Sequence, residues 1–218
     1  MALCCRSLTA SLFLAGAIAV SAQQSAPIVQ PGAPGQPGKL LTEETVRTPP
    51  RPPSKADVEF VQGMIMHHSQ AVEMVALLRT RGKSPALKSF GEKIAISQTD
   101  EIGFMKRWLE SRGQPTTMQM DHSHMSAADM KNMNMLMPGM LTPEQMAALT
   151  KARGAQIDHL FLTGMIQHHG GALTMVTDLF NTPGAGQDPV LFDFATDIDN
   201  TQSAEIKIMR GMLDKEKQ

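Results

Sequence analysis

Residues 57–76 read DVEFVQGMIMHHSQAVEMVA, and residues 158–177 read DHLFLTGMIQHHGGALTMVT. The two stretches share an Asp, a Phe, a Gly-Met-Ile, a His-His pair, an Ala and a Met at a constant offset of 101 residues. An internal repeat of this kind indicates that the chain uses one structural unit twice. The fold is therefore expected to contain two related halves.

Each copy of the repeat has the spacing of an amphipathic helix. At 3.6 residues per turn, the apolar residues and both histidines of a copy fall on one side, whereas Glu73 points away toward solvent. In the first copy this side carries Phe60, Val61, Met64, His67, His68, Ala71, Val75 and Leu78, and in the second Phe161, Leu162, Met165, His168, His169, Ala172 and Val176. A buried polar group without a partner costs about 1–3 kcal/mol. Each histidine therefore needs a hydrogen-bond partner or a metal.

Helix-start and helix-stop residues divide each half into two helices. Ser54 is expected to cap a helix that runs to about residue 80 and stops at Gly82, and a second helix follows over residues 86–111. In the second half, residues 184–189 form the turn and residues 190–214 the partner helix. Two such hairpins can bury their apolar sides only against each other, which predicts an all-α fold, an antiparallel four-helix bundle.

The partner helix of each hairpin carries a Gln-x-x-Glu pair on its apolar side. These pairs are Gln98/Glu101 and Gln202/Glu205, and both should face the histidine helices. A carboxylate at this depth needs a partner, and a histidine is the nearest candidate. In metal sites such a carboxylate either binds the ion or orients an imidazole that does.

The first 53 residues are predicted to lie outside the bundle. Arg6, an apolar run from residue 8 to residue 20 and the small residues before position 23 are typical of a secretory signal peptide over residues 1–22. We expect an exported protein, periplasmic if its source is a Gram-negative bacterium. Both cysteines, Cys4 and Cys5, would be removed with the signal, so soft-metal chemistry would rest on Met and His. Residues 23–53, rich in Pro and Gly, are expected to form a leader without packed structure.

The crossing between the hairpins (residues 54–113 and 154–218) spans residues 114–153 and is dense in methionine. Its Met residues are Met118, Met120, Met125, Met130, Met133, Met135, Met137, Met140 and Met146, and they are interleaved with His122 and His124. Thioethers and imidazoles favour soft metal ions. We therefore expect a second metal-binding region at Met118, Met120, Met125, His122 and His124. A short helix should start at Thr142-Pro143-Glu144 and run toward Lys151.

The doubled motif resembles the domain-of-unknown-function family 305. The family signature is Met-Ile-x-His-His-x-x-Ala-x-x-Met, preceded by Asp-x-x-Phe and followed by Gln-x-x-Glu-Ile-x-x-Met, and both halves match it over roughly residues 55–215. The resemblance implies a ferritin-like four-helix fold and, as in exported copper-tolerance members, copper binding. Gly170 and Gly171 depart from the first copy, where Ser69 and Gln70 stand. Each glycine weakens a helix by about 1 kcal/mol, which indicates closer helix packing or a different second site.

The preferred interpretation is an exported copper-binding protein, a buffer or metallochaperone for copper tolerance. Its partners would be metal ions and another exported copper protein. A net charge of −1 and few aromatic residues leave no basic surface for nucleic acid, and no membrane association is expected after signal cleavage. The expected ligands in the hairpins are His67, His68, Met64, Met74 and Glu101, and His168, His169, Met165, Met175 and Glu205. Thioether with imidazole suits Cu(I), and imidazole also accepts Cu(II), while other transition metals remain open.

Two alternatives stay open at this point. A ferritin-like metalloenzyme, such as an oxidase, would need several inward carboxylates with Glu-x-x-His pairs, which the chain lacks, so no enzyme activity is expected. In a structural or partner-binding bundle, Glu101 and Glu205 would simply satisfy the histidines. Asp57 and Asp158 are either helix-terminal charges or acceptors for histidine, and both interpretations stand. Met105, Met209 and Met212 are expected to pack the core.

Overall fold

The computed structural model describes residues 28–30, 37–41, 52–118 and 137–216, and the chain divides into two units, Met1–Pro49 and Pro50–Gln218. In the first unit, strands β1 (Ile28–Gln30) and β2 (Lys39–Leu41) pair antiparallel, with Val29 opposite Leu40. This short ladder differs from the expected absence of regular structure in the leader. Aliphatic and β-branched residues favour extended pairing, and these segments contain them between the prolines.

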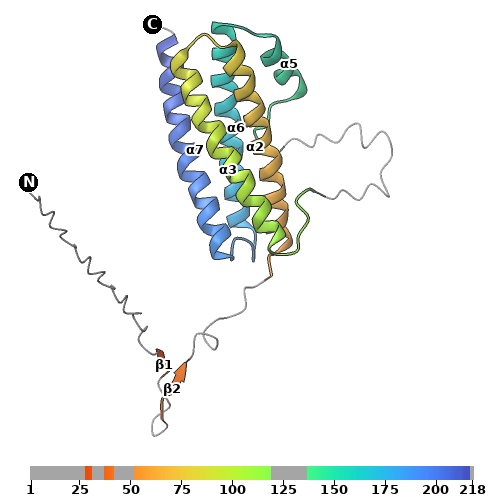
Figure 1. Cartoon of the computed structure of the whole chain (residues 1–218), viewed down its shortest axis with the longest axis vertical. Helices are drawn as coiled ribbons and strands as arrows, with labels where there is room; N and C mark the ends of the chain where they lie inside the picture. Colours follow the sequence, from red (N-terminus) through yellow and green to blue (C-terminus); the bar gives the residue numbers. More distant parts are fainter. Residues whose placement is uncertain (1–27, 31–36, 42–51, 119–136, 217–218) are drawn as a thin grey trace, which may run out of the picture. The chain divides into compact units, whose positions relative to one another are not determined.

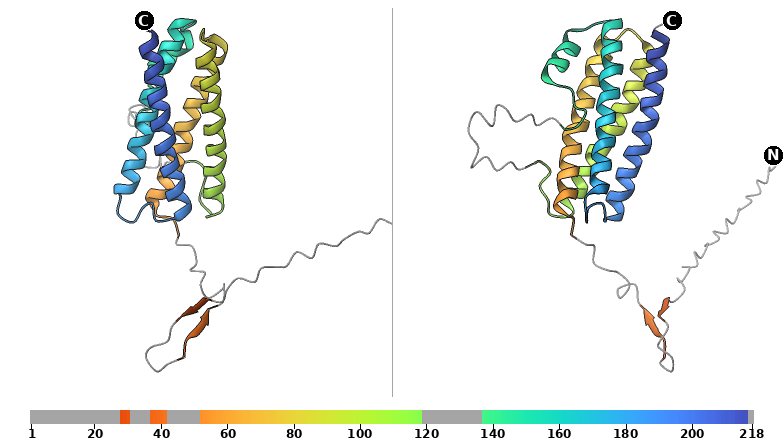
Figure 2. Two further views of the ribbon diagram at one scale, coloured as in Figure 1. Left: turned by 90° about the vertical axis from the view of Figure 1, so that its left-hand side faces the viewer. Right: turned by 180° about the vertical axis from the view of Figure 1, so that it is seen from behind.

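The second unit is the predicted helical bundle. Four long helices lie side by side: α2 (Lys55–Arg81), α3 (Pro85–Glu110), α6 (Ala155–Asn181) and α7 (Pro189–Glu216) (Figure 1). Helix α2 packs on α3, α6 packs on α7, and α2 and α6 join the two hairpins (Figure 2). The short helix α5 (Pro143–Lys151) contacts α2 and α6 near one end. None of the described helices is long and apolar enough to cross a bilayer.

Local sequence sets where these helices begin. Ser54 and Asp57 form a capping box, in which each side chain accepts a hydrogen bond from the other residue's backbone N–H. Helix α3 begins one residue before the predicted position because Pro85 occupies its first turn after the Ser84 cap. The predicted bounds of α2, α3 and α7 are confirmed to within two residues.

The apolar stripes meet in two buried clusters at opposite ends of the bundle. The cluster at the α2 N-terminal end includes Phe60, Met64, Met105, Trp108, Met175 and Leu191, and the other includes Met74, Leu78, Ile94, Leu149, Met165 and Met209. Met105 and Met209 are fully buried and Met212 packs against the second cluster, so the prediction that these three methionines fill the core is confirmed. The four histidines lie on α2 and α6, the two helices that join the hairpins.

Each repeat aspartate ties its own helix to the turn of the other hairpin. Asp57 Oδ1 accepts from the backbone N–H of Gly186 at 2.7 Å, in the α6–α7 turn. Asp158 accepts from the N–H groups of Lys83 at 3.0 Å and Ser84 at 2.8 Å, in the α2–α3 turn. Both aspartates are buried and sit in the first turns of their helices. In the described structure both carboxylates accept hydrogen bonds from backbone amides and not from imidazoles, which supports the interpretation as helix-terminal charges.

Replacing Asp57 with Ala should destabilise the bundle by about 1–2 kcal/mol, because it removes a helix cap and the bond to the opposite turn. Urea denaturation of the purified chain measures this change. Asp100, which is exposed on α3, provides the matched control, and its Ala variant should unfold like the wild type. Equal midpoints for the two variants would contradict the role of Asp57.

Candidate functional site

The four repeat histidines form one row across the centre of the bundle. All four side chains are fully buried. The ring centroids of His67 and His168 lie 3.7 Å apart, and His68 and His169 flank them at 6.3 Å and 6.2 Å from their neighbours. The sequence predicted one site in each hairpin. The structure instead brings the two histidine pairs together, because the helices that carry them pack on each other.

Every Nε2 atom in the row has a hydrogen-bond partner that can only accept. His68 bonds Glu101 at 2.6 Å and His169 bonds Glu205 at 2.7 Å. His67 bonds the Pro138 carbonyl at 3.0 Å, and His168 bonds the backbone carbonyl of His67 at 2.9 Å. Carboxylates and carbonyls supply no proton. In the neutral form of each imidazole, we therefore assign the proton to Nε2, which leaves Nδ1 as a lone pair.

These Nδ1 lone pairs are buried without a hydrogen-bond partner. The same holds for both amide atoms of Gln98 and of Gln202, and together these eight atoms are all the orphaned side-chain groups found in the described ranges. Native cores satisfy most of their polar groups. The hydrogen bonds at Nε2, to Glu101, Glu205 and two backbone carbonyls, thus account for only half of each imidazole's capacity, so a purely structural role leaves the Nδ1 atoms unexplained.

Burial keeps the central imidazoles neutral. Desolvation, followed by the charge of neighbouring His68, lowers the pKa of His67 from 6.5 to about 3, although the Pro138 carbonyl opposes the shift. Desolvation and then the charge of His67 lower the pKa of His168 well below its usual value. Metal ions bind the neutral form of imidazole. Both central lone pairs are therefore available at neutral pH.

The same pKa shifts make the stability of the metal-free protein depend on pH. The unfolded chain takes up protons on these histidines near pH 6.5 while the native state does not, so their contribution is complete above about pH 6.5 and is lost as the pH falls, for His67 toward its native pKa of about 3. Between about pH 6 and pH 5 the free energy of unfolding should fall by about 1.4 kcal/mol per pH unit for each histidine. Urea denaturation at several pH values measures this slope.

Two variants test the assignment of that slope. A variant with His67 and His168 both changed to Leu should lose most of it. His159, whose side chain is 58% exposed, serves as the control, and its Asn variant should keep the slope. If the double variant kept the same pH dependence of the free energy of unfolding, other titrating groups would be its cause.

A segment of the crossing, residues 137–141, delivers the Pro138 carbonyl to His67. We call this segment the strap. Gln70 holds it on one side, donating to the Leu141 carbonyl at 3.0 Å and accepting from the Leu141 N–H at 2.7 Å. On the other side it passes over Gly171, where an added Cβ would lie 1.8 Å from the Pro138 oxygen. Gly171, which replaces Gln70 of the first copy, thus permits close passage of the strap, a non-helical segment, rather than the closer helix packing expected above. At Gly170 nothing lies within 4 Å of an added Cβ.

The other predicted ligands lie in the core, at the edge of a described segment or outside the described residues. Met64 and Met165 are fully buried core residues, as is Met74, and Met175 is 8% exposed. Met118 ends a described segment and is half-buried. The remaining predicted ligands of the crossing, Met120, His122, His124 and Met125, lie outside the described residues. Sequence reasoning missed the Pro138 carbonyl, for which the Pro-Gly pair in the crossing was the only signal.

The donor set fits a soft or borderline metal better than a hard one. Within the described segments, no three His, Cys, Asp or Glu side chains are grouped to hold an ion. The imidazole lone pairs would therefore need thioether or Gln amide donors to complete a coordination shell. Glu101 and Glu205 bond the Nε2 atoms, so they are placed to orient the rings, with Nδ1 free to bind.

The chain is similar to a known protein family and to several solved structures. A family model described as "Domain of unknown function (DUF305)" matches residues 57–213. A crystallised DUF305 fragment from Deinococcus radiodurans is 29% identical with a TM-score of 0.62, over 76% of this chain and 99% of that one. A DUF305 protein from Streptomyces coelicolor is 30% identical with a TM-score of 0.60, over 73% and 93%. CopM in its Cu(I)-bound form is 27% identical with a TM-score of 0.54, over 73% and 96%, and similar structures include its Cu(II)- and Ag-bound forms.

A shorter match links the chain to an uncharacterised protein, L153, of Acanthamoeba polyphaga mimivirus. It is 39% identical over 56 residues, which is 26% of this chain. The aligned part spans 37% of the length of that curated relative.

Proposed function

Because this chain belongs to the DUF305 family, we propose that it is an exported copper-binding protein that buffers copper or passes it on. Copper is its cargo and not a resident cofactor. The similarity to CopM, which has been solved with Cu(I) and Cu(II) bound, supports the choice of metal. The signal-like residues 1–22 support export, and they lie outside the described residues.

One observation carries the proposal: four buried imidazoles each present an unpartnered Nδ1 lone pair. A histidine kept only for packing would be expected to use both nitrogens, since each orphaned polar group costs about 1–3 kcal/mol. Metal binding would use these lone pairs. The free energy of metal binding would then offset the cost of burying them in the native state.

The residues suggest a division of roles. His67, His68, His168 and His169 would supply nitrogen to the ion. Three of the predicted thioethers, Met64, Met74 and Met165, and the amides of Gln98 and Gln202, are further potential donors in the core. Imidazole with thioether favours Cu(I), and imidazole alone also accepts Cu(II). Glu101 and Glu205 would hold the outer rings in the tautomer that binds metal.

The test compares copper binding and thermal melting in the purified mature chain. A ligand that binds only the native state must raise the melting temperature, so Cu(II), and Cu(I) under anaerobic conditions, should raise it and bind with saturable stoichiometry. A variant with all four row histidines changed to Ala should lose most of the binding. His159→Ala removes an exposed histidine and should bind like the wild type.

A second variant is needed in case the fourfold histidine variant does not fold. His67→Leu with His168→Leu removes only the two central rings and keeps an apolar core. Circular dichroism would establish that it folds. If copper neither raised the melting temperature of the wild type nor bound more weakly to the folded histidine variants, the proposed function would be wrong.

A further inference from the structure

Three methionine side chains meet over Gly63, a buried glycine in the N-terminal half of α2. Around the point where a Cβ of Gly63 would lie, Met137 Sδ is 3.1 Å away, Met175 Cε 3.4 Å and Met118 Cε 3.5 Å. Met175 belongs to α6, whereas Met118 and Met137 lie in the two described parts of the crossing, residues 114–118 and 137–153. Residues far apart in sequence thus bring the ends of three methionine side chains around one glycine.

The internal repeat shows that packing alone does not require thioethers here. Gly164 is the counterpart of Gly63 in the second copy, and Met74 is the counterpart of Met175. At Gly164, Met74 Cε again approaches, at 3.3 Å, but its companion is a leucine, Leu141, with Cδ2 at 3.0 Å. At Gly164 a leucine therefore fills the space that Met118 and Met137 fill at Gly63.

The thioethers are also accessible to an ion from solvent. They line a surface pocket of about 450 Å³ together with Phe60, Gln62 and Pro138. Met118 and Met137 are half-buried, so neither is sealed in the core. Gln62 fixes the chain before Met118 by donating to the Pro115 carbonyl at 2.7 Å. Pro138 in the same pocket bonds His67, which connects the pocket to the end of the histidine row.

We propose that Met118, Met137 and Met175 form a separate site for a soft monovalent cation, Cu(I) or Ag(I). Neutral sulfur donors favour such ions and discriminate against hard divalent cations. The identification of Cu(I) as the natural cargo rests on the proposed function. The binding chemistry does not, because the site uses none of the row histidines.

The first test counts bound ions with Ag(I) as the probe. The full mature chain is titrated with Ag(I), and separately with Cu(II), and the complexes are weighed by native mass spectrometry. Changing Met118, Met137 and Met175 to Leu should remove one Ag(I) per chain and leave Cu(II) binding unchanged. Leu141 shows that leucine fits the equivalent position, and circular dichroism verifies the fold.

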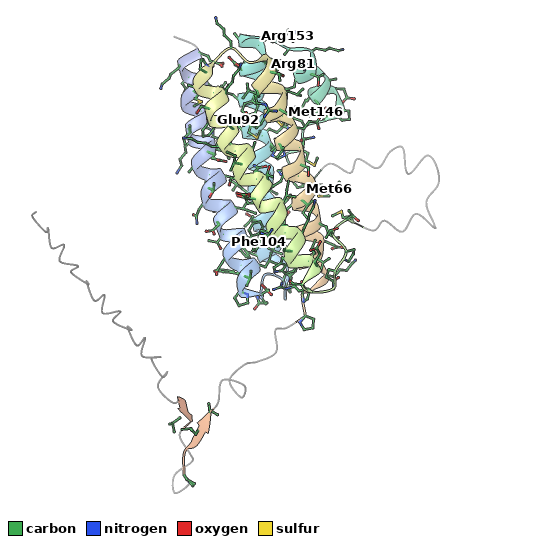
Figure 3. The ribbon with its side chains drawn as sticks, viewed as in Figure 1. Met66, Arg81, Glu92, Phe104, Met146 and Arg153 are labelled. Atoms are coloured by element: carbon green, nitrogen blue, oxygen red, sulfur yellow. The ribbon has the colours of Figure 1, made fainter. Side chains whose placement is uncertain are left out.

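A matched control removes three thioethers elsewhere. Met146, Met209 and Met212 belong to or pack against the cluster at the other end of the bundle. Figure 3 shows Met146 far along the bundle from Phe104, which packs against the first cluster. Changing these three to Leu should leave Ag(I) stoichiometry unchanged. Equal loss in the two triple variants, or no loss in either, would overturn the proposal.

A second readout identifies the atoms. In the methyl spectrum of the protein labelled at methionine Cε, Ag(I) should shift the signals of Met118, Met137 and Met175 together, at one equivalent. Shifts confined to other methionines would overturn the site. The variant lacking the row histidines should keep these shifts. If the variant binds no Cu(II) and yet keeps the methionine shifts, the two sites are separate. If the wild-type protein binds no Cu(II) but still shows the methionine shifts, the methionine site stands and only the proposed function is wrong.

Discussion

Changing Gly171 to Ala is expected to destabilise the bundle by about 3 kcal/mol or more, whereas changing its neighbour Gly170 to Ala should stabilise it by about 1 kcal/mol. An added Cβ at Gly171 would lie 1.8 Å from the Pro138 oxygen and 2.5 Å from Gly139 Cα, which are backbone atoms. Nothing lies within 4 Å of a Cβ at Gly170. The two substitutions make the same chemical change on the same helix, so only the strap distinguishes them.

The cost at Gly171 has two parts. The strap must move away from α6, and the Pro138 carbonyl would then leave His67 Nε2, a fully buried donor. Urea denaturation at neutral pH measures the first effect, and the imidazole NMR signals of His67 report the second. Similar unfolding midpoints for the two alanine variants would mean that the strap does not depend on Gly171.

The helices could be predicted from the sequence because their signals are local. Apolar residues at steps of three and four, with Ser54, Gly82 and Pro85 at the boundaries, give the register and the ends of α2 and α3. The repeat then predicts the second hairpin. The pairing of each outer histidine with a glutamate also follows from local spacing, since Glu101 and Glu205 lie on the inward stripe.

The rest of the site depends on tertiary contacts that spacing does not reveal. No periodicity shows that Asp57 reaches Gly186, or that the ring centroids of His67 and His168 lie 3.7 Å apart. The Gly-Gly pair suggested closer helix packing or a different second site, whereas the structure shows a non-helical segment, the strap, passing over Gly171. The strap also breaks the symmetry of the repeat, since His67 bonds Pro138 whereas His168 bonds the backbone of α2.

Changing both Glu101 and Glu205 to Leu is expected to weaken copper binding by about 10–100-fold or more, since partners of this kind tune metal affinity over that range. Each carboxylate accepts from Nε2 of an outer histidine, at 2.6 Å and 2.7 Å. It therefore holds the proton on Nε2 and leaves Nδ1 unprotonated. Leucine cannot accept a hydrogen bond, so the proton could occupy Nδ1 and block the lone pair that binds metal.

A Gln variant separates the tautomer effect from simple loss of charge. Gln at both positions can accept from Nε2–H or donate to Nε2, so it permits the binding tautomer without enforcing it. Copper affinity, measured by competition with a chelator of known strength, should therefore follow the order wild type, Gln variant, Leu variant. Glu110, exposed at the end of α3, is the control, and its Leu variant should match the wild type. Equal affinities in the Leu variant and the wild type would show that these carboxylates do not orient metal-binding rings, because nothing else bonds those Nε2 atoms in the described structure.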